Sequence, residues 1–406
     1  MGADAVVIPS LERLDLSSIN IHKIWHHSSS PSMGYLNFLK VKRCHNLKYM
    51  LPSFLAKDLV QLRFLRILDC NMMEQVVFPS LKRLQIQNCD LLEEIIELQG
   101  LIADESQSTS AAQSIVTETV MTKFLFPELI YLRLCKIFTP QCPESQVGIS
   151  NQQPLFCVNE DTFLVLEELT LKTNDMVKRI CDGQLSLQCF QNLNALNLHC
   201  FRKRSTTLPY CFIRSLPKLQ KLVINNASIS EIVRSEGLIE EERHTSVFYH
   251  LKDLRLSQLQ ELSLKTFKPS LLSFKNLTTL EVSRCHGFIN LIACSTAKCL
   301  TLLERLSIDD CEMIEEIIAS SFSLAHHSLE FPVLQMVKVT KCPKMRNFCQ
   351  GDLSTPRLEQ MHLTRDEKGE LQWEGGLNTT IKHMFDEMNV QNSQVTEVSD
   401  QLPKLE

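Results

Sequence analysis

Two cysteine–histidine pairs, Cys44-His45 and Cys285-His286, are the residues of this sequence whose types and spacing come nearest to nucleophilic chemistry. A cysteine nucleophile acts as its thiolate, and a neighbouring imidazole is a common means of lowering the thiol pKa. Such a thiol must also be accessible to a substrate. The element that carries each pair therefore decides between a catalytic thiol and a buried structural one.

The patterns for metal or cofactor binding are weak. His22 and His26 are four residues apart, but a third metal ligand is not evident. No Cys-x-x-Cys pair occurs, and none of the eleven glycines is followed by lysine, which excludes a phosphate-binding P-loop. The sequence also lacks the G-x-S-x-G and H-E-x-x-H motifs. We therefore predict that the chain is not an enzyme, with no catalytic residues, no metal and no cofactor.

The cysteines belong to a leucine repeat that runs along the chain. The pattern Leu-x-x-Leu-x-Leu recurs thirteen times with conservative replacements, at a median step of 26 residues. Leucine-rich repeats have a period of about 20–29 residues. The first leucines of the copies are Leu11, Leu36, Leu62, Leu81, Leu129, Leu166, Leu193, Leu219, Leu251, Leu277, Leu303, Leu334 and Leu358.

In six copies a cysteine follows the first leucine by eight residues, and apolar residues follow that cysteine by three and by six. These cysteines are Cys44, Cys70, Cys89, Cys285, Cys311 and Cys342. The unit is L-x-x-L-x-L-x-x-C-x-x-Φ-x-x-Φ, where Φ is apolar. Because the thiol falls at a fixed turn position, we predict that it is buried and has a packing role rather than a catalytic one.

The repeat predicts an α/β fold, a leucine-rich-repeat solenoid of about 13 repeats. The x-L-x-L-x stretch has period two, so it forms a short strand with its leucines on one side. One such strand cannot bury its apolar side alone, and stacking the copies gives a curved parallel sheet on the concave face. The Φ-x-x-Φ segment returns along a convex face that we expect to be irregular or short-helical.

The predicted domain boundaries follow the repeats. The solenoid covers residues 1–366, with polar inserts at 98–125 and 138–160. Residues 367–388 form a C-terminal cap that buries Trp373 and contains a helix from Thr379 to Met388. Residues 389–406 are polar, and we expect a disordered tail there.

Composition and charge narrow the choice of partners and compartment. The chain of 406 residues is 44% hydrophobic and 22% charged with a net charge of −5, so no overall basic field favours nucleic acid. Neither a signal peptide nor a run of about 18 apolar residues is present, which predicts a cytoplasmic protein without a membrane span. The sixteen cysteines then fit reduced thiols better than disulfides.

The strand side chains that alternate with the leucines line the concave face. In the first five repeats they include six cations and three aromatic rings, whereas the later repeats have mixed charge. The nine residues are Arg13, Phe38, Lys40, Lys42, Phe64, Arg66, Arg83, Tyr131 and Arg133. Arginine and aromatic residues are frequent anchors of protein interfaces, so these nine predict a contact for an acidic partner surface. An ordinary solvated sheet face remains the alternative.

Several repeats resemble a known family. The segment Phe78 to Cys89, followed by Leu92 to Ile96, is similar to the C-terminal repeats of plant coiled-coil, nucleotide-binding, leucine-rich-repeat (CC-NB-LRR) disease resistance proteins, as is Phe331 to Met345. The tail from Trp373 to Phe385 is similar to the end of that family. The resemblance covers about 90% of the chain.

The resemblance implies a cytosolic module of plant defence. Its protein partners would be a pathogen effector or a guarded host protein, and the nucleotide-binding domain that these repeats restrain in the family. The coiled-coil and nucleotide-binding parts are absent from this sequence, so we do not expect this chain to hydrolyse ATP or to signal alone.

Two other classes of repeat protein are alternatives to this family. Cysteine-containing repeats also occur in substrate-recruiting adaptors of ubiquitin ligases, but those carry an N-terminal F-box and a regular helix after each cysteine, and neither is evident. Secreted plant repeats use asparagine and a Gly-x-Ile-Pro turn, which the low glycine count opposes.

Overall fold

The computed structural model places most of the repeats in two compact units, residues 1–197 and 198–406. The structure describes residues 10–24, 34–50, 59–78, 81–92, 94–97, 128–135, 163–172, 190–199, 208, 210–229, 232, 248–262, 274–319, 328–364 and 376–382. Five predicted features lie outside them: both polar inserts, Trp373, residues 383–388 of the predicted cap helix, and the tail at 389–406.

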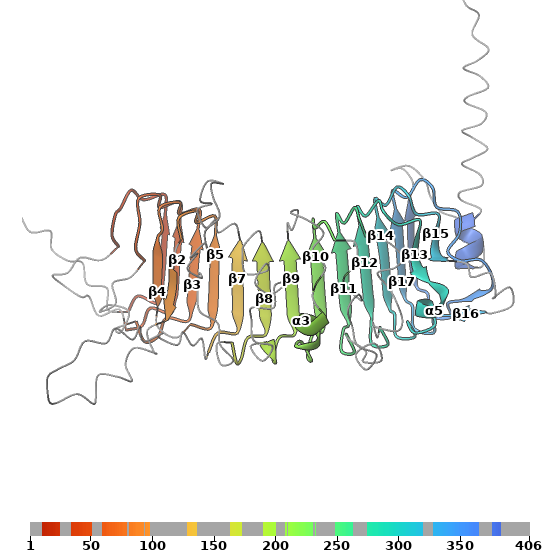
Figure 1. Cartoon of the computed structure of the whole chain (residues 1–406), viewed down its shortest axis with the longest axis horizontal. Helices are drawn as coiled ribbons and strands as arrows, with labels where there is room; N and C mark the ends of the chain where they lie inside the picture. Colours follow the sequence, from red (N-terminus) through yellow and green to blue (C-terminus); the bar gives the residue numbers. More distant parts are fainter. Residues whose placement is uncertain are drawn as a thin grey trace, which may run out of the picture. The chain divides into compact units, whose positions relative to one another are not determined.

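Every copy of the leucine pattern forms a five-residue strand that begins two residues after its first leucine, which confirms the thirteen predicted strands of a parallel sheet (Figure 1). The first unit contains β1 (Arg13–Ser17), β2 (Phe38–Lys42), β3 (Phe64–Leu68), β5 (Arg83–Gln87), β7 (Tyr131–Cys135), β8 (Glu168–Lys172) and most of β9 (Ala195–His199). The second contains β10 (Lys221–Asn225), β11 (Asp253–Ser257), β12 (Thr279–Ser283), β14 (Arg305–Asp309), β17 (Met336–Thr340) and β19 (Gln360–Thr364).

The core is built from the leucine positions of neighbouring repeats. In β2, Leu39 and Val41 are fully buried, and they are in register with Leu65 and Ile67 of β3. Each apolar side chain therefore packs on the same position of the next repeat, so a repeat depends on its neighbours for the burial of its apolar side.

The turn after each strand has one repeated backbone conformation. The residue seven positions after the first leucine has a φ between 52° and 56° in nine described repeats. We call these nine residues the turn row: Ser18, Arg43, Asp69, Asn88, Asn226, Gln258, Arg284, Asp310 and Lys341. This left-handed conformation favours glycine, yet every one of the nine is a polar residue with a side chain.

The residue after the turn row is the predicted cysteine, and its burial is confirmed. All six of these cysteines are at most 1% exposed. Their thiols donate to the carbonyl oxygen two residues earlier, as from Cys70 to Leu68 at 3.3 Å and from Cys311 to Asp309 at 3.4 Å. The turn thus satisfies a strand-end carbonyl with a group that also packs in the core.

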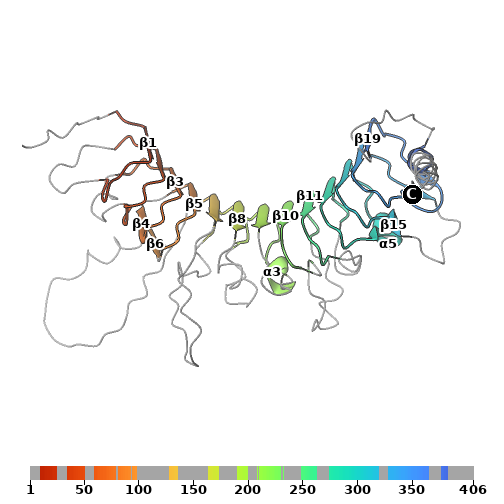
Figure 2. The ribbon, with the colours of Figure 1, turned by 90° about the horizontal axis from the view of Figure 1, so that it is seen from above.

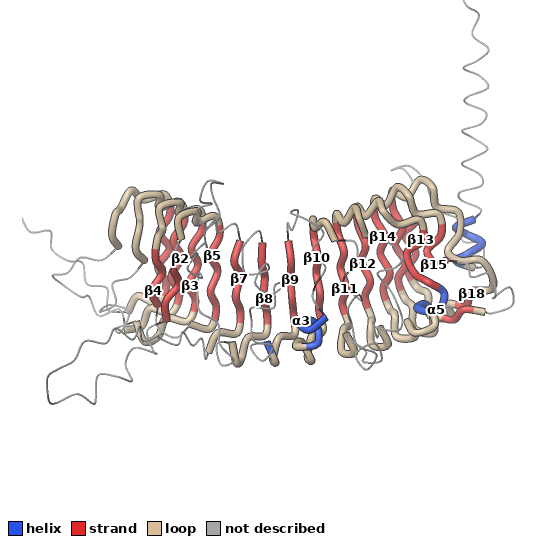
Figure 3. The backbone as a smooth tube through the Cα atoms, viewed as in Figure 1, coloured by secondary structure: helices blue, strands red, loops and turns tan. Residues whose placement is uncertain are grey.

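The return segments contain short strands as well as helices (Figure 3). The helices α3 (Tyr210–Arg214) and α5 (Cys294–Ala297) agree with the expected short-helical character. The strand pairs were not predicted: β4 (Gln75–Phe78) with β6 (Glu94–Glu97), β13 (Asn290–Ala293) with β15 (Glu316–Ala319), and β16 (Leu329–Glu330) with β18 (Leu353–Ser354). The β-branched residues of segments such as Glu316–Ala319 favour an extended backbone.

Residues 377–382 are helical, so the helix begins two residues before the predicted Thr379. The carbonyl of Gly376 accepts the main-chain N–H of Thr380 at 3.0 Å and its hydroxyl at 2.7 Å. Leu377 and Ile381 are buried, and the side chain of Asn378 forms hydrogen bonds with the main chain of Phe348 and Cys349, which connects the helix to that segment. Within the described part of the chain, no helix is long and apolar enough to span a membrane.

Candidate protein-interaction surface

The first, third and fifth residues of each strand lie on the side of the sheet away from the return segments. We call this side the open face. Figure 2 views the sheet from above, and β4 and β6 lie on one side of β3 and β5. No described segment covers the opposite side of β3 and β5. In β2 the open-face side chains are half-buried and alternate with fully buried ones.

The strand register of the first unit brings the nine predicted residues together in three rows. The first row is Arg13, Phe38, Phe64, Arg83 and Tyr131. The second is Asp15, Lys40, Arg66, Gln85 and Arg133. The third is Ser17, Lys42, Leu68, Gln87 and Cys135. We call the nine predicted residues in these rows the basic–aromatic stripe.

Along the first row, arginine guanidinium groups and aromatic rings form a continuous series of contacts. The guanidinium carbon of Arg13 lies 4.0 Å from the centroid of the Phe38 ring, and the Phe38 and Phe64 centroids are 6.4 Å apart. Arg83 lies between the next two rings, 5.9 Å from the Phe64 centroid and 5.7 Å from that of Tyr131. Exposed contacts of this kind contribute about 0.5–1 kcal/mol each. The contacts restrict the side chains, so less entropy is lost when a partner binds.

Charge on the stripe is largely uncompensated. Lys40 forms an ion pair with Asp15 at 2.8 Å. The other five cations of the stripe make no ion pair with any residue that the structure describes. The Lys40–Asp15 pair was not predicted from the sequence.

Arg133 is set deeper than an ordinary surface cation. Its Nε atom is buried and has no acceptor among the described residues. Hydrogen bonding with the side chain of Cys135 is the main cause that raises the pKa of Arg133, so the guanidinium stays charged. In the third row, Leu68 and Cys135 are buried and Lys42 is the one stripe residue. The accessible part of the stripe therefore consists of residues of the first two rows together with Lys42.

The open face of the second unit has a different character, as its mixed charges predicted. Arg255 is bound by Asp253 at 2.9 Å and by Glu281 at 3.1 Å. No Phe, Tyr or Trp occupies an open-face position of its six sheet strands. The concentration of free positive charge with aromatic rings is therefore a property of the first unit.

The cysteine–histidine pairs do not form a reactive site in this geometry. Cys285 is fully buried, and desolvation raises its pKa to about 11, which keeps the thiol protonated. The imidazole of His286 accepts the main-chain N–H of Glu312 through Nδ1 at 3.3 Å. Cys44 is fully buried as well. Among the described residues, no group of three side chains is placed to hold a metal ion; His22 belongs to this part of the chain, and His26 does not.

Residues 10–79 and 165–312 match a family model described as "Plant disease resistance protein RPS2-like, leucine-rich repeats". Together these two stretches are more than half of the chain. The chain belongs to this family. The resemblance to the repeats of plant resistance proteins and the solenoid fold are thereby confirmed. A comparison with curated proteins finds no significant match.

The turn row was not predicted from the sequence as a functional element. The signal was present, because a polar residue stands immediately before each of the six repeated cysteines: Arg43, Asp69, Asn88, Arg284, Asp310 and Lys341. The pattern does not reveal that these side chains project from a left-handed backbone. That requires the φ angles.

Proposed function

We propose that this chain is a protein-recognition module of plant innate immunity, and that the basic–aromatic stripe is its contact surface. The observation that supports this most is the set of five cations that form no ion pair with a described residue and lie beside aromatic rings in contact with two of the arginines. Arginine and aromatic side chains are the residue types that carry most binding energy at interfaces. The chain acts by binding, in the cytoplasm, and uses no cofactor.

The partner that fits the stripe has an acidic surface. In a resistance receptor two partners have this role: an effector or guarded host protein, and the nucleotide-binding switch that the repeats restrain. Both are protein surfaces, and one stripe serves both if the ligand displaces the switch. Sensing and autoinhibition then compete for the same cations.

The experiment is a pull-down of this chain, co-expressed with the coiled-coil and nucleotide-binding halves of a related receptor. Charge reversals at Lys42, Arg66 and Arg83 test the stripe, and Lys40 is reversed separately because Asp15 already compensates it. We expect each of the three to weaken association about tenfold or more and Lys40→Glu to have a smaller effect. Association through the stripe should also weaken between low and high salt.

Reversals at Arg305 and Lys338 are the matched controls. Both are open-face cations of the second unit without an ion pair to a described residue. If they weaken association as much as the stripe variants do, general charge is responsible and the stripe is not the contact surface. If stripe reversals leave association unchanged, the stripe has no role in it.

The alternative class, a ubiquitin-ligase adaptor, is disfavoured by the return segments. Its repeats would place a regular helix after each cysteine, whereas Cys70, Cys89, Cys285 and Cys311 are followed by the short strands β4, β6, β13 and β15. Capture of a Skp-type protein, with no association to the receptor halves, would assign the chain to the adaptor class.

A further inference from the structure

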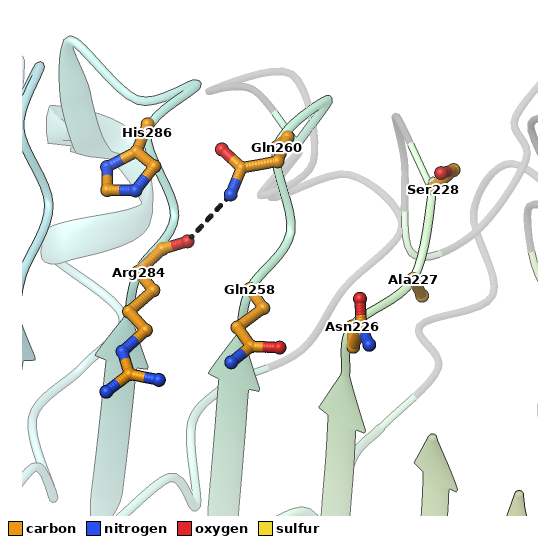
Figure 4. A pocket seen from close by; sticks show the side chains of 7 residues that line it. All are labelled: Asn226, Ala227, Ser228, Gln258, Gln260, Arg284 and His286. Atoms are coloured by element: carbon orange, nitrogen blue, oxygen red, sulfur yellow. Dashed lines mark hydrogen bonds between the residues drawn. The ribbon is translucent and has the colours of Figure 1, made fainter. Parts of the chain in front are cut away.

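A recess of about 520 Å³ opens in the second unit where β10, β11 and β12 end (Figure 4). Two rows of side chains line it. Asn226, Gln258 and Arg284 come from the turn row, and Ser228, Gln260 and His286 stand two residues further along the same three repeats. Ala227 adds a small apolar area. The recess is thus a regular product of three successive turns and is separate from the basic–aromatic stripe.

The lining offers hydrogen bonds of both kinds. Gln260 donates through Nε2 to the carbonyl of Arg284 at 3.3 Å, which leaves its Oε1 as an acceptor. The carboxamide of Gln258 has no hydrogen-bond partner among the described residues. Because Nδ1 of His286 accepts a main-chain N–H, the imidazole carries its proton on Nε2 when neutral and presents a donor there.

The recess is lined by one permanently charged side chain, that of Arg284, which also forms an ion pair with Asp310 outside the lining. No carboxylate lines it, and Arg284 contributes a guanidinium whose side chain is 57% exposed. Its nearest anion is Asp310 in the neighbouring turn, at 3.5 Å from Nε, which is a loose ion pair. A carboxylate entering the recess would find a cation that is mostly accessible and only weakly engaged.

Carboxamide side chains already bind main chain elsewhere in this molecule. Asn276 donates to the carbonyl of Tyr249 at 2.7 Å. Asn378 pairs with Cys349 in both senses, accepting its N–H at 3.3 Å and donating to its carbonyl at 2.8 Å. A carboxamide presents one acceptor and two donors in a plane, which matches the acceptor and donor of a peptide group. Gln258 and Gln260 offer the same chemistry to a chain from outside.

We propose that this recess binds an extended, acidic segment of a partner protein through its main chain. Gln258 and Gln260 pair with peptide groups of the segment, while Arg284, with His286 beside it, binds an aspartate or glutamate side chain. Extended segments leave their N–H and C=O groups free for such pairing, whereas a helix uses them internally. The site does not depend on the stripe and would add a second contact.

The turn conformation allows lining side chains to be removed by substitution with glycine, with little effect on the backbone. Arg284 and Gln258 have φ values of 53° and 55°, where glycine is the least strained residue. Arg284→Gly and Gln258→Gly therefore remove a lining side chain without disturbing the backbone. Lys341→Gly is the matched control, because Lys341 is a cation at the same turn position with a φ of 54° and lies outside the recess.

The experiment selects 12-residue peptides by phage display on the full chain and measures their binding by fluorescence anisotropy. We expect acidic residues to be enriched and the dissociation constant to rise about tenfold for Arg284→Gly and Gln258→Gly, with Lys341→Gly unchanged. N-methylation of single amides along the peptide should abolish binding for at least two of the positions tested, because it removes main-chain donors.

Three results would overturn the proposal. They are the absence of any selected peptide, binding that is insensitive to both recess variants, and equal losses in Arg284→Gly and Lys341→Gly. Selected peptides that respond to charge reversal at Arg66 and not to the recess variants would belong to the stripe and would also count against this site. The proposal for the stripe and the proposal for the recess can therefore be disproved independently of each other.

Discussion

Asn378 holds the main chain of Cys349 from both sides, with its Oδ1 accepting the N–H at 3.3 Å and its Nδ2 donating to the carbonyl at 2.8 Å. The same Oδ1 accepts the N–H of Phe348 at 3.0 Å. In the preceding repeats these main-chain groups pair with the next return segment, as Ile318 does with Phe348. The carboxamide therefore makes main-chain hydrogen bonds of the kind that a following return segment makes in preceding repeats, and it connects the helix at 377–382 to the segment that contains Phe348 and Cys349.

We predict that Asn378→Ala lowers the free energy of unfolding by about 2 kcal/mol, because buried N–H and C=O groups lose their partners. Urea denaturation followed by circular dichroism measures it. Asn347→Ala is the control, since Asn347 lies in the same segment and its side chain makes no hydrogen bond with a described residue. Equal midpoints for the two variants would show that the carboxamide contributes nothing.

Gly287 provides a second stability prediction. A Cβ atom at this position would lie 2.6 Å from the carbonyl oxygens of both Gln260 and Leu262, and main chain cannot move aside as a flexible side chain can. Gly287→Ala should therefore cost about 2–3 kcal/mol. Gly34→Ala, where a Cβ would meet nothing within 4 Å, should be near neutral in the same thermal unfolding assay. A stable Gly287→Ala protein would contradict the packing of these two turns.

The sequence was sufficient for the thirteen-stranded sheet because the repeat encodes it directly, although it did not predict the strand pairs of the return segments. Alternating leucines define the strands, and the fixed spacing of Cys70 or Cys311 from its first leucine defines the turn, so register and burial follow from counting. Stacking then needs no further information, since each repeat contacts only its neighbours.

The candidate surface was predictable only in part. The rows of the stripe follow from alternation, but the compensation of Lys40 by Asp15 depends on which side chains reach each other across strands. The recess could not be predicted from the sequence. It arises from left-handed turns at Gln258 and Arg284, and neither residue type indicates a left-handed backbone. Glycine would have signalled such a turn, and none of the nine turn-row residues is glycine.

The turn row leads to a third prediction, at a position away from the recess. Arg43 is exposed and has a φ of 54°. Arg43→Gly should leave the protein equally stable or stabilise it by up to about 1 kcal/mol, whereas Arg43→Val should cost about 1–2 kcal/mol, because a β-branched residue resists this conformation. The difference between the two urea midpoints is the measurement. A valine variant as stable as the glycine variant would mean that the turn conformation is different in solution.

The buried thiols lead to a fourth prediction, on alkaline stability. Burial raises the pKa of Cys89 to about 12 and those of Cys70 and Cys342 to about 11. An unfolded thiol ionises near pH 8.5, so between about pH 9 and 11 the unfolded state binds fewer protons than the folded state. The stability is therefore fully present below about pH 8.5 and falls as the pH rises, by about 1.4 kcal/mol per pH unit for each such thiol.

Lysine and tyrosine residues also titrate in this range, so a variant must isolate the thiol contribution. Cys89→Ala should be less stable than the parent at pH 8, because it leaves a cavity in the core. Above pH 9 the free energy of unfolding of Cys89→Ala should fall less steeply with pH than that of the parent, by about 1.4 kcal/mol per pH unit. The reason is that the variant lacks one thiol whose pKa is raised by folding. Urea denaturation at pH 8, 9 and 10 gives both slopes. Parallel slopes would mean that Cys89 ionises as readily in the folded state as in the unfolded one, and that the thiol is accessible to water.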